Sequence, residues 1–287
     1  MGACAQRDVS LAFCMPRGRF LARVTGESSG NVLLRRAQYR AADDPGPCCR
    51  IARSMIFGKI YNARWSIERT RRDHGLRLDA AALSAVSSQL KDLLPQIAEE
   101  TSLDSLRGLE GAGAALYFGV FDQMILGEKP LFSFQNRNRR PPRDPVNAML
   151  SFAYSLLTHD CASSLESVGL DAYVGFLHRD RPGRTSLALD LMEELRPCMA
   201  DRFVLTLINN RIVGKSEFEF RENGTVLLND AGRRSFLKHW QERKREQLTH
   251  PYLQEKLPWG LIPYVQALLL ARCLREDLDA YPPFLWK

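Results

Sequence analysis

Hydrophobic residues recur every three to four positions through the first half of the chain, which is the period of an α-helix with one buried face. Leucine, isoleucine, alanine and aromatic residues supply this period in four stretches. The pattern predicts helices over residues 28–42, 46–73, 79–99 and 102–126. The letters TSLD at 101–104 are typical of a capping box with Asp104 as its acidic partner, and Gly127 is a natural end for the fourth helix.

The second half of the chain alternates breaks with further helical periods. Residues 132–145 read FSFQNRNRRPPRDP, whose prolines forbid a helix until Pro145, which suits the first turn of the next one. The spacing predicts helices over 145–158, 162–177, 186–210, 230–248 and 257–277. The alternating letters EFEFRENGTVLL predict a hairpin that turns at Asn223 and Gly224 with a type I′ turn.

The first 26 residues have a different pattern. SLAFCM and FLARVTG, joined by PRGR, predict two short strands with a Pro/Gly turn between them. A lone hairpin is marginally stable in water, so this fragment of a sheet needs more strands or a helical neighbour.

Composition narrows the class of protein. With 45% hydrophobic and 25% charged residues the chain is globular rather than disordered. A net charge of +7, mostly from arginine, favours a polyanionic partner. Seven cysteines without a CxxC pair indicate neither a zinc site nor a disulfide framework. No apolar stretch reaches the ~20 residues of a membrane span and no signal peptide opens the chain, so we expect a soluble, cytoplasmic protein that does not bind a membrane.

Glu110 lies in an unusual setting, within GLEGAGAALYFGVF. Leu103, Leu106, Glu110 and Tyr117 share one face of a predicted helix, so the carboxylate lies on the stripe that faces the core. A buried carboxylate needs an arginine, a metal or a ligand group beside it. Pairing with a structural arginine, or bending towards solvent, is the more common explanation of such a residue.

Two further segments carry candidate metal ligands. His178 ends YVGFLH, and Asp190 and Glu193 share one face of the next predicted helix, where Glu194 is almost as well placed as Glu193. A lone histidine at a helix end is most often a cap, and an acidic pair is most often a solvated surface. Together with Glu110 these side chains supply hard oxygen ligands and one imidazole, a mixture suited to Mg²⁺ or Mn²⁺.

Arginines near these candidate ligands indicate that the substrate is a nucleic acid. A divalent ion near phosphate-binding arginines predicts phosphodiester transfer or hydrolysis, whereas a glycosidase-like carboxylate pair leaves His178 unexplained. The loop before residue 145 and the segment after His178 supply the candidate DNA contacts, which are Arg137, Arg139, Arg140, Arg143, Arg181 and Arg184. The cations of helix 46–73, Lys59 among them, are expected to form mostly a solvated face.

Four segments, in their order and spacing, resemble a known family. They read LRGLEGAGAALYFGVF, RNRRPPRDPVNAMLSFAYSLL, GFLH and LALDLMEELRP. Over nearly its whole length the chain is similar to the CRISPR-associated adaptation integrases, the "Cas-one" endonucleases, in particular to their subtype I-C.

The resemblance implies a mainly α protein with a small N-terminal β domain and a larger helical domain, assembled as a homodimer. It also implies a second small CRISPR-associated adaptation protein as partner, and double-stranded DNA fragments inserted as new spacers by transesterification. By motif position, Glu110, His178 and Glu193 correspond to the metal ligands and Asp190 to the acidic residue beside them.

Family members begin with several more strands than this chain. Residues 1–27 are therefore expected to be the remnant of an incomplete β domain, and 28–287 the helical catalytic domain. An incomplete β domain leaves an alternative open, a non-catalytic DNA-binding scaffold unable to assemble. A helical interaction protein, in which the acids form only structural pairs, is a third possibility.

Overall fold

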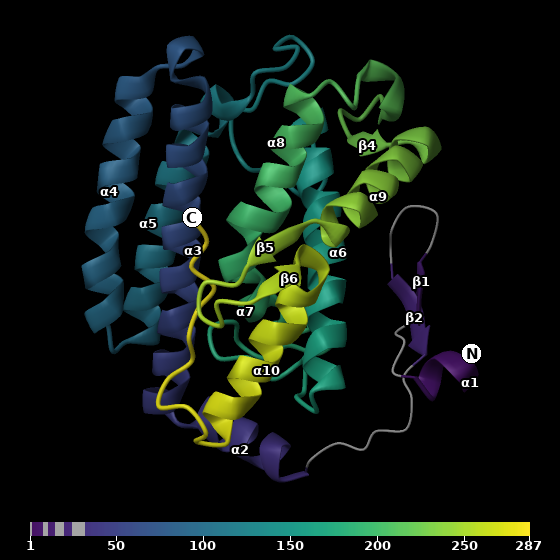
Figure 1. Ribbon diagram of the computed structural model, residues 1–287. Coiled ribbons are helices and arrows are strands. Elements are labelled where there is room, and N and C mark those ends of the chain that lie inside the picture. The colour runs from purple at the N-terminus through teal and green to yellow at the C-terminus, as the bar shows by residue number, and fades with distance from the viewer. Residues whose placement is uncertain (1, 8–10, 15–19, 25–31) are drawn as a thin grey trace.

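The computed structural model describes residues 2–7, 11–14, 20–24 and 32–287, and it is mainly helical (Figure 1). The helices are α1 (Gly2–Ala5), α2 (Val32–Asp43), α3 (Pro45–His74), α4 (Ala80–Glu99), α5 (Leu103–Gly119), α6 (Pro145–Ser167), α7 (Ser186–Leu195), α8 (Arg202–Asn209), α9 (Asp230–Arg245) and α10 (Ile262–Leu274). A π-helical segment (Arg196–Asp201) joins α7 to α8 without a break. The predicted fold class, a mainly α protein with small N-terminal strands, is confirmed.

The long helix α3 organises the helical body. It packs against α4 and α5 on one side, where the three helices stand together in Figure 1, and against α7 on another. Met55, Ile56, Ile60 and Ile67 are fully buried in these contacts. A hydrophobic face of this length explains why the strict helical period of the sequence could be read over the whole helix.

Close approach of α5 to α3 depends on Gly113. A methyl group at this position would lie 2.3 Å from the Cδ1 atom of Ile60, so a larger side chain would push the helices apart. Gly108 and Gly111, on either side of Glu110, have open space around them instead. Gly113 therefore brings the two helices together, whereas Gly108 and Gly111 lie on the exposed face of α5.

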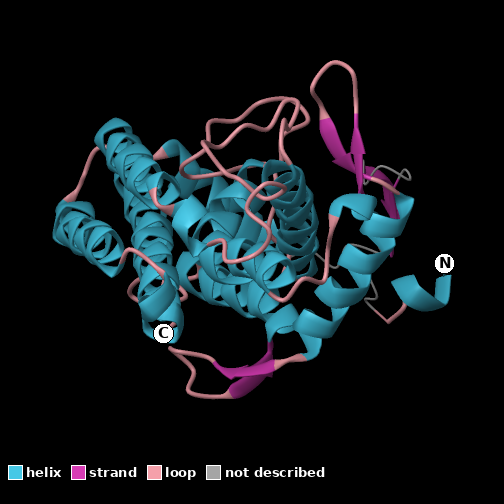
Figure 2. Ribbon diagram, turned by 90° about the horizontal axis from the view of Figure 1, so that it is seen from above, coloured by secondary structure: helices cyan, strands magenta, loops and turns pink. Residues whose placement is uncertain are grey.

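Among the residues that the structure describes, three two-stranded antiparallel hairpins accompany the helices. The predicted N-terminal pair is present as β1 (Leu11–Cys14) and β2 (Phe20–Val24), while its PRGR turn lies outside the described residues. β3 (Phe218–Phe220) and β4 (Val226–Leu228) are the predicted second hairpin. β5 (Gln247–Thr249) and β6 (Lys256–Pro258) were not predicted. Figure 2 shows the hairpins at the margin of the helices.

The turn of the second hairpin differs from the predicted type I′. Gly224 has φ +78°, whereas Asn223 does not adopt a positive φ, and the amide of Gly224 donates to the carbonyl of Arg221 over 2.9 Å. This is a type I turn followed by a left-handed glycine, the geometry of a three-residue loop. Only one residue, the glycine, needs the unusual conformation.

Several predicted helix ends were wrong. No helix covers 162–177, because α6 continues to Ser167 and residues 170–185 form a loop, most of whose apolar side chains are buried without helical structure. α5 ends at Gly119, well before Gly127, and its N-cap is Ser102, which accepts a hydrogen bond from the Ser105 amide rather than forming the expected capping box. α10 begins at Ile262, because β6 and a short 3₁₀ turn occupy the residues before it.

Two smaller expectations concern thiols and membranes. The cysteines whose side chains the structure describes are all free thiols, as expected. In the described part of the chain, no helix has an apolar run long enough to cross a bilayer.

Candidate metal centre

Glu110 and Glu193 face each other across a single lysine. The Lys59 ammonium, on α3, donates to Oε1 of Glu110 on α5 and lies 2.6 Å from Oε2 of Glu193 on α7. The Lys59 and Glu193 side chains are 9% and 6% exposed, and Glu110 is 27% exposed. Glu110 is thus at the rim of the core rather than inside it, and its partner is a lysine rather than an arginine, a metal or a ligand group.

Glu193 has a second cation beside it. Arg196 Nη1 lies 2.7 Å and 3.0 Å from the two carboxylate oxygens of Glu193. Burial by itself would raise the pKa of Glu193, but the charges of Arg196 and Lys59 outweigh burial and lower the pKa to about 2. Glu193 therefore stays a carboxylate, the form in which it can bind a cation, down to very acidic pH.

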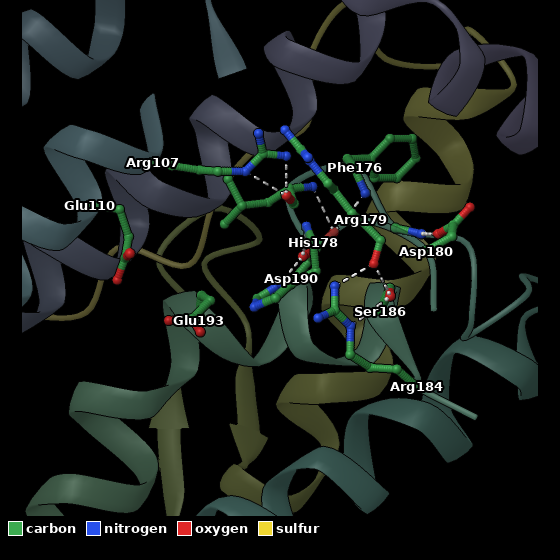
Figure 3. A network of polar contacts seen from close by, with 12 residues as sticks. Arg107, Glu110, Phe176, His178, Arg179, Asp180, Arg184, Ser186, Asp190 and Glu193 are labelled. Carbon is green, nitrogen blue, oxygen red and sulfur yellow. Dashed lines mark hydrogen bonds and ion pairs between the residues drawn. The ribbon is translucent and has the colours of Figure 1, made fainter. Parts of the chain in front are cut away.

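His178 is held by Asp190, which is fully buried (Figure 3). One oxygen of Asp190 accepts the amides of Phe176 and Leu177 over 2.6 and 2.9 Å. The other oxygen accepts the His178 amide over 3.0 Å and lies 2.5 Å from His178 Nδ1. With four hydrogen bonds to receive, Asp190 has no free oxygen for an ion, and it positions the histidine so that Nε2 is the nitrogen left to bind.

The loop that carries His178 is fixed from several sides. Gly175 passes so close to Asp190 that a methyl group there would lie 2.8 Å from a carboxylate oxygen. The Arg107 guanidinium, on α5, donates to the carbonyl of Leu177 over 2.7 and 3.1 Å. These contacts explain why residues predicted as the end of a helix form a loop: Asp190 takes the amides that a helix would use.

The three predicted ligands come from α5, α7 and the loop before α7, and Figure 3 shows them around one region. The structure describes no group of three histidine, cysteine, aspartate or glutamate side chains that lie close enough together to hold an ion among its described residues. The donor set nevertheless fits a divalent cation. Two carboxylates already share one cation, the Lys59 ammonium, and the imidazole of His178 lies in the same region (Figure 3).

Glu194, which spacing alone makes nearly equivalent to Glu193, faces the opposite way. It is fully buried and accepts hydrogen bonds from the Tyr281 hydroxyl, the Gln266 amide group and the Phe284 backbone amide. Burial raises its pKa to about 7. Glu194 therefore anchors the C-terminal segment, and Glu193 is the acid that faces Glu110.

The family model for the CRISPR associated protein Cas1 matches residues 1–242. The chain belongs to the Cas1 family. CRISPR-associated endonuclease Cas1 2 of Rhodospirillum rubrum is 53% identical over 291 residues, which cover 100% of this chain and 84% of the relative. CRISPR-associated endonuclease Cas1 1 of Chlorobaculum tepidum is 46% identical, again over 100% of this chain and 84% of the relative.

Similar folds occur among solved structures. A casposase bound to integration product superposes with a TM-score of 0.84 at 25% identity, over 99% of this chain and 77% of that one. A chain of a partial Cas6-RT-Cas1–Cas2 complex superposes with a TM-score of 0.77 at 26% identity, over 99% of this chain and 82% of that one. None of these matches bears on the subtype, which stays a prediction.

The arginines of the predicted DNA-binding loop divide into two groups. Arg137 is half-buried, donates to Asn147 over 2.6 Å and to Ser151 over 3.1 Å, and stacks on the Tyr154 ring. Its guanidinium thus supports the loop from within. The other three, Arg139, Arg140 and Arg143, are exposed.

The arginines after His178 also differ from each other. Arg181 is exposed, whereas Arg184 is half-buried and donates to the Ser186 hydroxyl over 3.3 Å and to the carbonyl of Arg179. A hollow of about 420 Å³ borders His178 and is lined by Arg107 and Arg179. A larger one of about 1070 Å³, beside Arg202 and Trp259, contains none of the predicted site residues.

Sequence reasoning missed several residues of the site. It places Lys59 on a solvated face, although this residue lies four positions after Met55 and four before Ala63 on the apolar side of α3, a spacing that could have placed it inside. Arg196 and the pair Tyr154 and Asp201 were also missed. The Tyr154 hydroxyl donates to Asp201 over 2.5 Å, and the Arg196 guanidinium stacks on the Tyr154 ring.

Proposed function

We propose that this chain is a metal-dependent DNA endonuclease and integrase that inserts short DNA fragments as new spacers into a CRISPR array. The observation that carries the proposal is the shared cation position between Glu110 and Glu193, beside the free nitrogen of His178. The names of the relatives, CRISPR-associated endonucleases, support the nuclease activity. A casposase bound to its integration product supports strand transfer on this fold.

The proposed ligands of a Mg²⁺ or Mn²⁺ ion are Glu110, Glu193 and His178 through Nε2. When bound there, the ion would orient an oxygen nucleophile and offset the negative charge that develops on a phosphate. Asp190 keeps His178 in the tautomer whose Nε2 lone pair is free, and Arg196 holds Glu193 in place.

The proposed reaction is a transesterification. The 3′-hydroxyl oxygen of the incoming fragment loses its proton and bonds to a phosphorus of the repeat. The bond from that phosphorus to its original 3′-oxygen breaks, and the leaving oxygen takes up a proton, so that one ester and one hydroxyl replace another. Because one ester is exchanged for another, no external energy source is needed. Hydrolytic cleavage uses water in place of the 3′-hydroxyl at the same site.

Double-stranded DNA is the proposed substrate and partner. Exposed Arg139, Arg140, Arg143 and Arg181 are the contacts we propose for its phosphates, together with half-buried Arg184. One structural neighbour belongs to a complex with Cas2, which supports a second small adaptation protein as partner. We also propose that the chain acts as a homodimer.

A strand-transfer assay tests the proposal. A labelled DNA fragment, a plasmid with the repeat, Mn²⁺ and the small partner protein should give integrated product with the wild-type chain. Glu110→Ala should reduce that product by at least about 100-fold, because it removes a ligand of the ion that stabilises charge in the transition state. The control is Glu222→Ala, a change in the exposed hairpin loop, which should leave integration unchanged.

DNA binding measured in EDTA separates the alternatives. Glu110→Ala should still bind DNA with wild-type salt dependence, since the arginines are untouched. Full integration by Glu110→Ala would contradict the proposal. DNA binding by the wild type without any metal-dependent product would favour the non-catalytic scaffold, and the absence of both would favour a helical interaction protein.

A further inference from the structure

Lys59 occupies the position between Glu110 and Glu193 that a bound cation would take. Its ammonium contacts both carboxylates, and the whole residue is only 7% exposed. An ammonium is costly to bury unless acceptors surround it, and here the acceptors are the two oxygens that the proposed function assigns to a metal ion.

Formal charges cancel in this cluster. Lys59 and Arg196 supply two cations, and Glu110 and Glu193 supply two carboxylates. Without Lys59 only Arg196, which pairs with Glu193, would balance the two carboxylates, so the lysine stabilises the site in the absence of metal. Adding a divalent ion to the unchanged cluster would place an excess positive charge directly beside an ammonium.

We propose, building on the proposed function, that Lys59 is a built-in competitor of the divalent ion: metal binds only when the Lys59 ammonium leaves the oxygens of Glu110 and Glu193. The apparent affinity for metal is then the intrinsic affinity reduced by the small fraction of molecules in which the lysine is displaced.

The surroundings give the displaced side chain somewhere to go. The site opens to solvent at Glu110, whose side chain is 27% exposed against 6% for Glu193. A lysine side chain has four rotatable bonds, so its ammonium can swing towards this side without a backbone movement, where a phosphate of the DNA could accept it.

Mn²⁺ titration of the full chain without DNA tests the proposal, read by calorimetry or by the electron spin resonance signal of free Mn²⁺. Lys59→Met keeps the length of the stem but removes the ammonium, so it should bind Mn²⁺ at least about tenfold more tightly than the wild type. Lys59→Arg keeps a cation at the same place and should show no gain. Lys129→Met breaks a solvent-exposed pair with Asp122 and should bind as the wild type does.

A second measurement covers the case in which Lys59→Met is poorly folded. Thermal unfolding with and without Mn²⁺ should give a larger metal-induced rise in Tm for Lys59→Gln than for the wild type, because the metal then replaces a missing cation. The double variant Lys59→Gln with Glu110→Gln should lose that rise.

The outcomes separate this proposal from the proposed function. Equal or weaker Mn²⁺ binding by folded Lys59→Met and Lys59→Gln, with binding still dependent on Glu110, would overturn the competition and leave the metal site standing. Absence of Glu110-dependent Mn²⁺ binding in the wild type and in the Lys59 variants would overturn both.

Discussion

Asp190 shows how much of the site depends on a single buried carboxylate. Its four hydrogen bonds hold residues 176–178 as a loop and turn His178 so that Nε2 remains free. From the sequence, Asp190 was predicted to be the acidic residue beside the metal ligands. The sequence could not predict the direction of the side chain, because the amides that Asp190 accepts become available only when the predicted helix 162–177 does not form.

Asp190→Asn tests this positioning role. An asparagine amide group must point a donor at one of the donors that Asp190 now accepts, so the variant should lose on the order of 1–3 kcal/mol of unfolding free energy. Its Mn²⁺ affinity should fall by about 10–100-fold, the usual effect of removing a carboxylate behind a histidine ligand. Urea unfolding and Mn²⁺ titration measure the two effects.

The exposed Asp92 on α4 offers the matched control. Asp92→Asn should change neither quantity. Wild-type Mn²⁺ affinity in Asp190→Asn would show that the hydrogen bond to Nδ1 does not position His178 as a ligand.

At the scale of elements, α7 and the π-helical segment present different faces to different parts of the protein. Glu193 faces Lys59, while its neighbour Glu194 faces Gln266, Tyr281 and Phe284. Five residues after Arg196, Asp201 meets the same Tyr154 side chain on α6. Hydrophobic periodicity predicted these helices well, but it could not choose between adjacent acids, since the choice depends on α3 and on the C-terminal segment.

Glu194 should make stability depend on pH. Its folded pKa is about 7, against an ordinary value of 4.5, so between these pH values the folded state holds a proton that the unfolded state has released. Stability from this group is therefore greatest below pH 4.5 and is lost as the pH rises through 7, by on the order of 3 kcal/mol. Urea unfolding at pH 5 and pH 8 measures the change.

Glu194→Gln removes the titrating group and should flatten that part of the pH dependence. The comparison with the wild type is essential, because Asp201, whose pKa is raised by burial to about 6, contributes in the same direction in both proteins. An identical slope in the two proteins would mean that Glu194 does not titrate in this range.

At the scale of the whole molecule, charge and architecture agree with a protein that handles DNA. The net charge is +7, and the exposed Arg139, Arg140 and Arg143 form no ion pair with any other residue that the structure describes. Composition alone could predict a polyanionic partner. It could not separate these three from Arg137, whose guanidinium is buried against Tyr154 and Asn147, since all four stand in one proline-rich loop.

The domain division at residues 27 and 28 stays a prediction, as does the homodimer. The assembly of the site does not depend on either, because α3, α5, α7 and the loop at His178 all belong to the helical part of the chain. The proposed reaction and partners therefore rest on the likeness to relatives, whereas one chain provides the geometry of the site.

The position of a bound metal ion is the most direct test of this account. A crystal of the protein grown with Mn²⁺, measured at a wavelength where manganese scatters anomalously, should show a peak in direct contact with Glu110, Glu193 and Nε2 of His178, with the Lys59 ammonium moved away. A Mn²⁺ peak elsewhere, with Lys59 still between the two carboxylates at saturating metal, would contradict it.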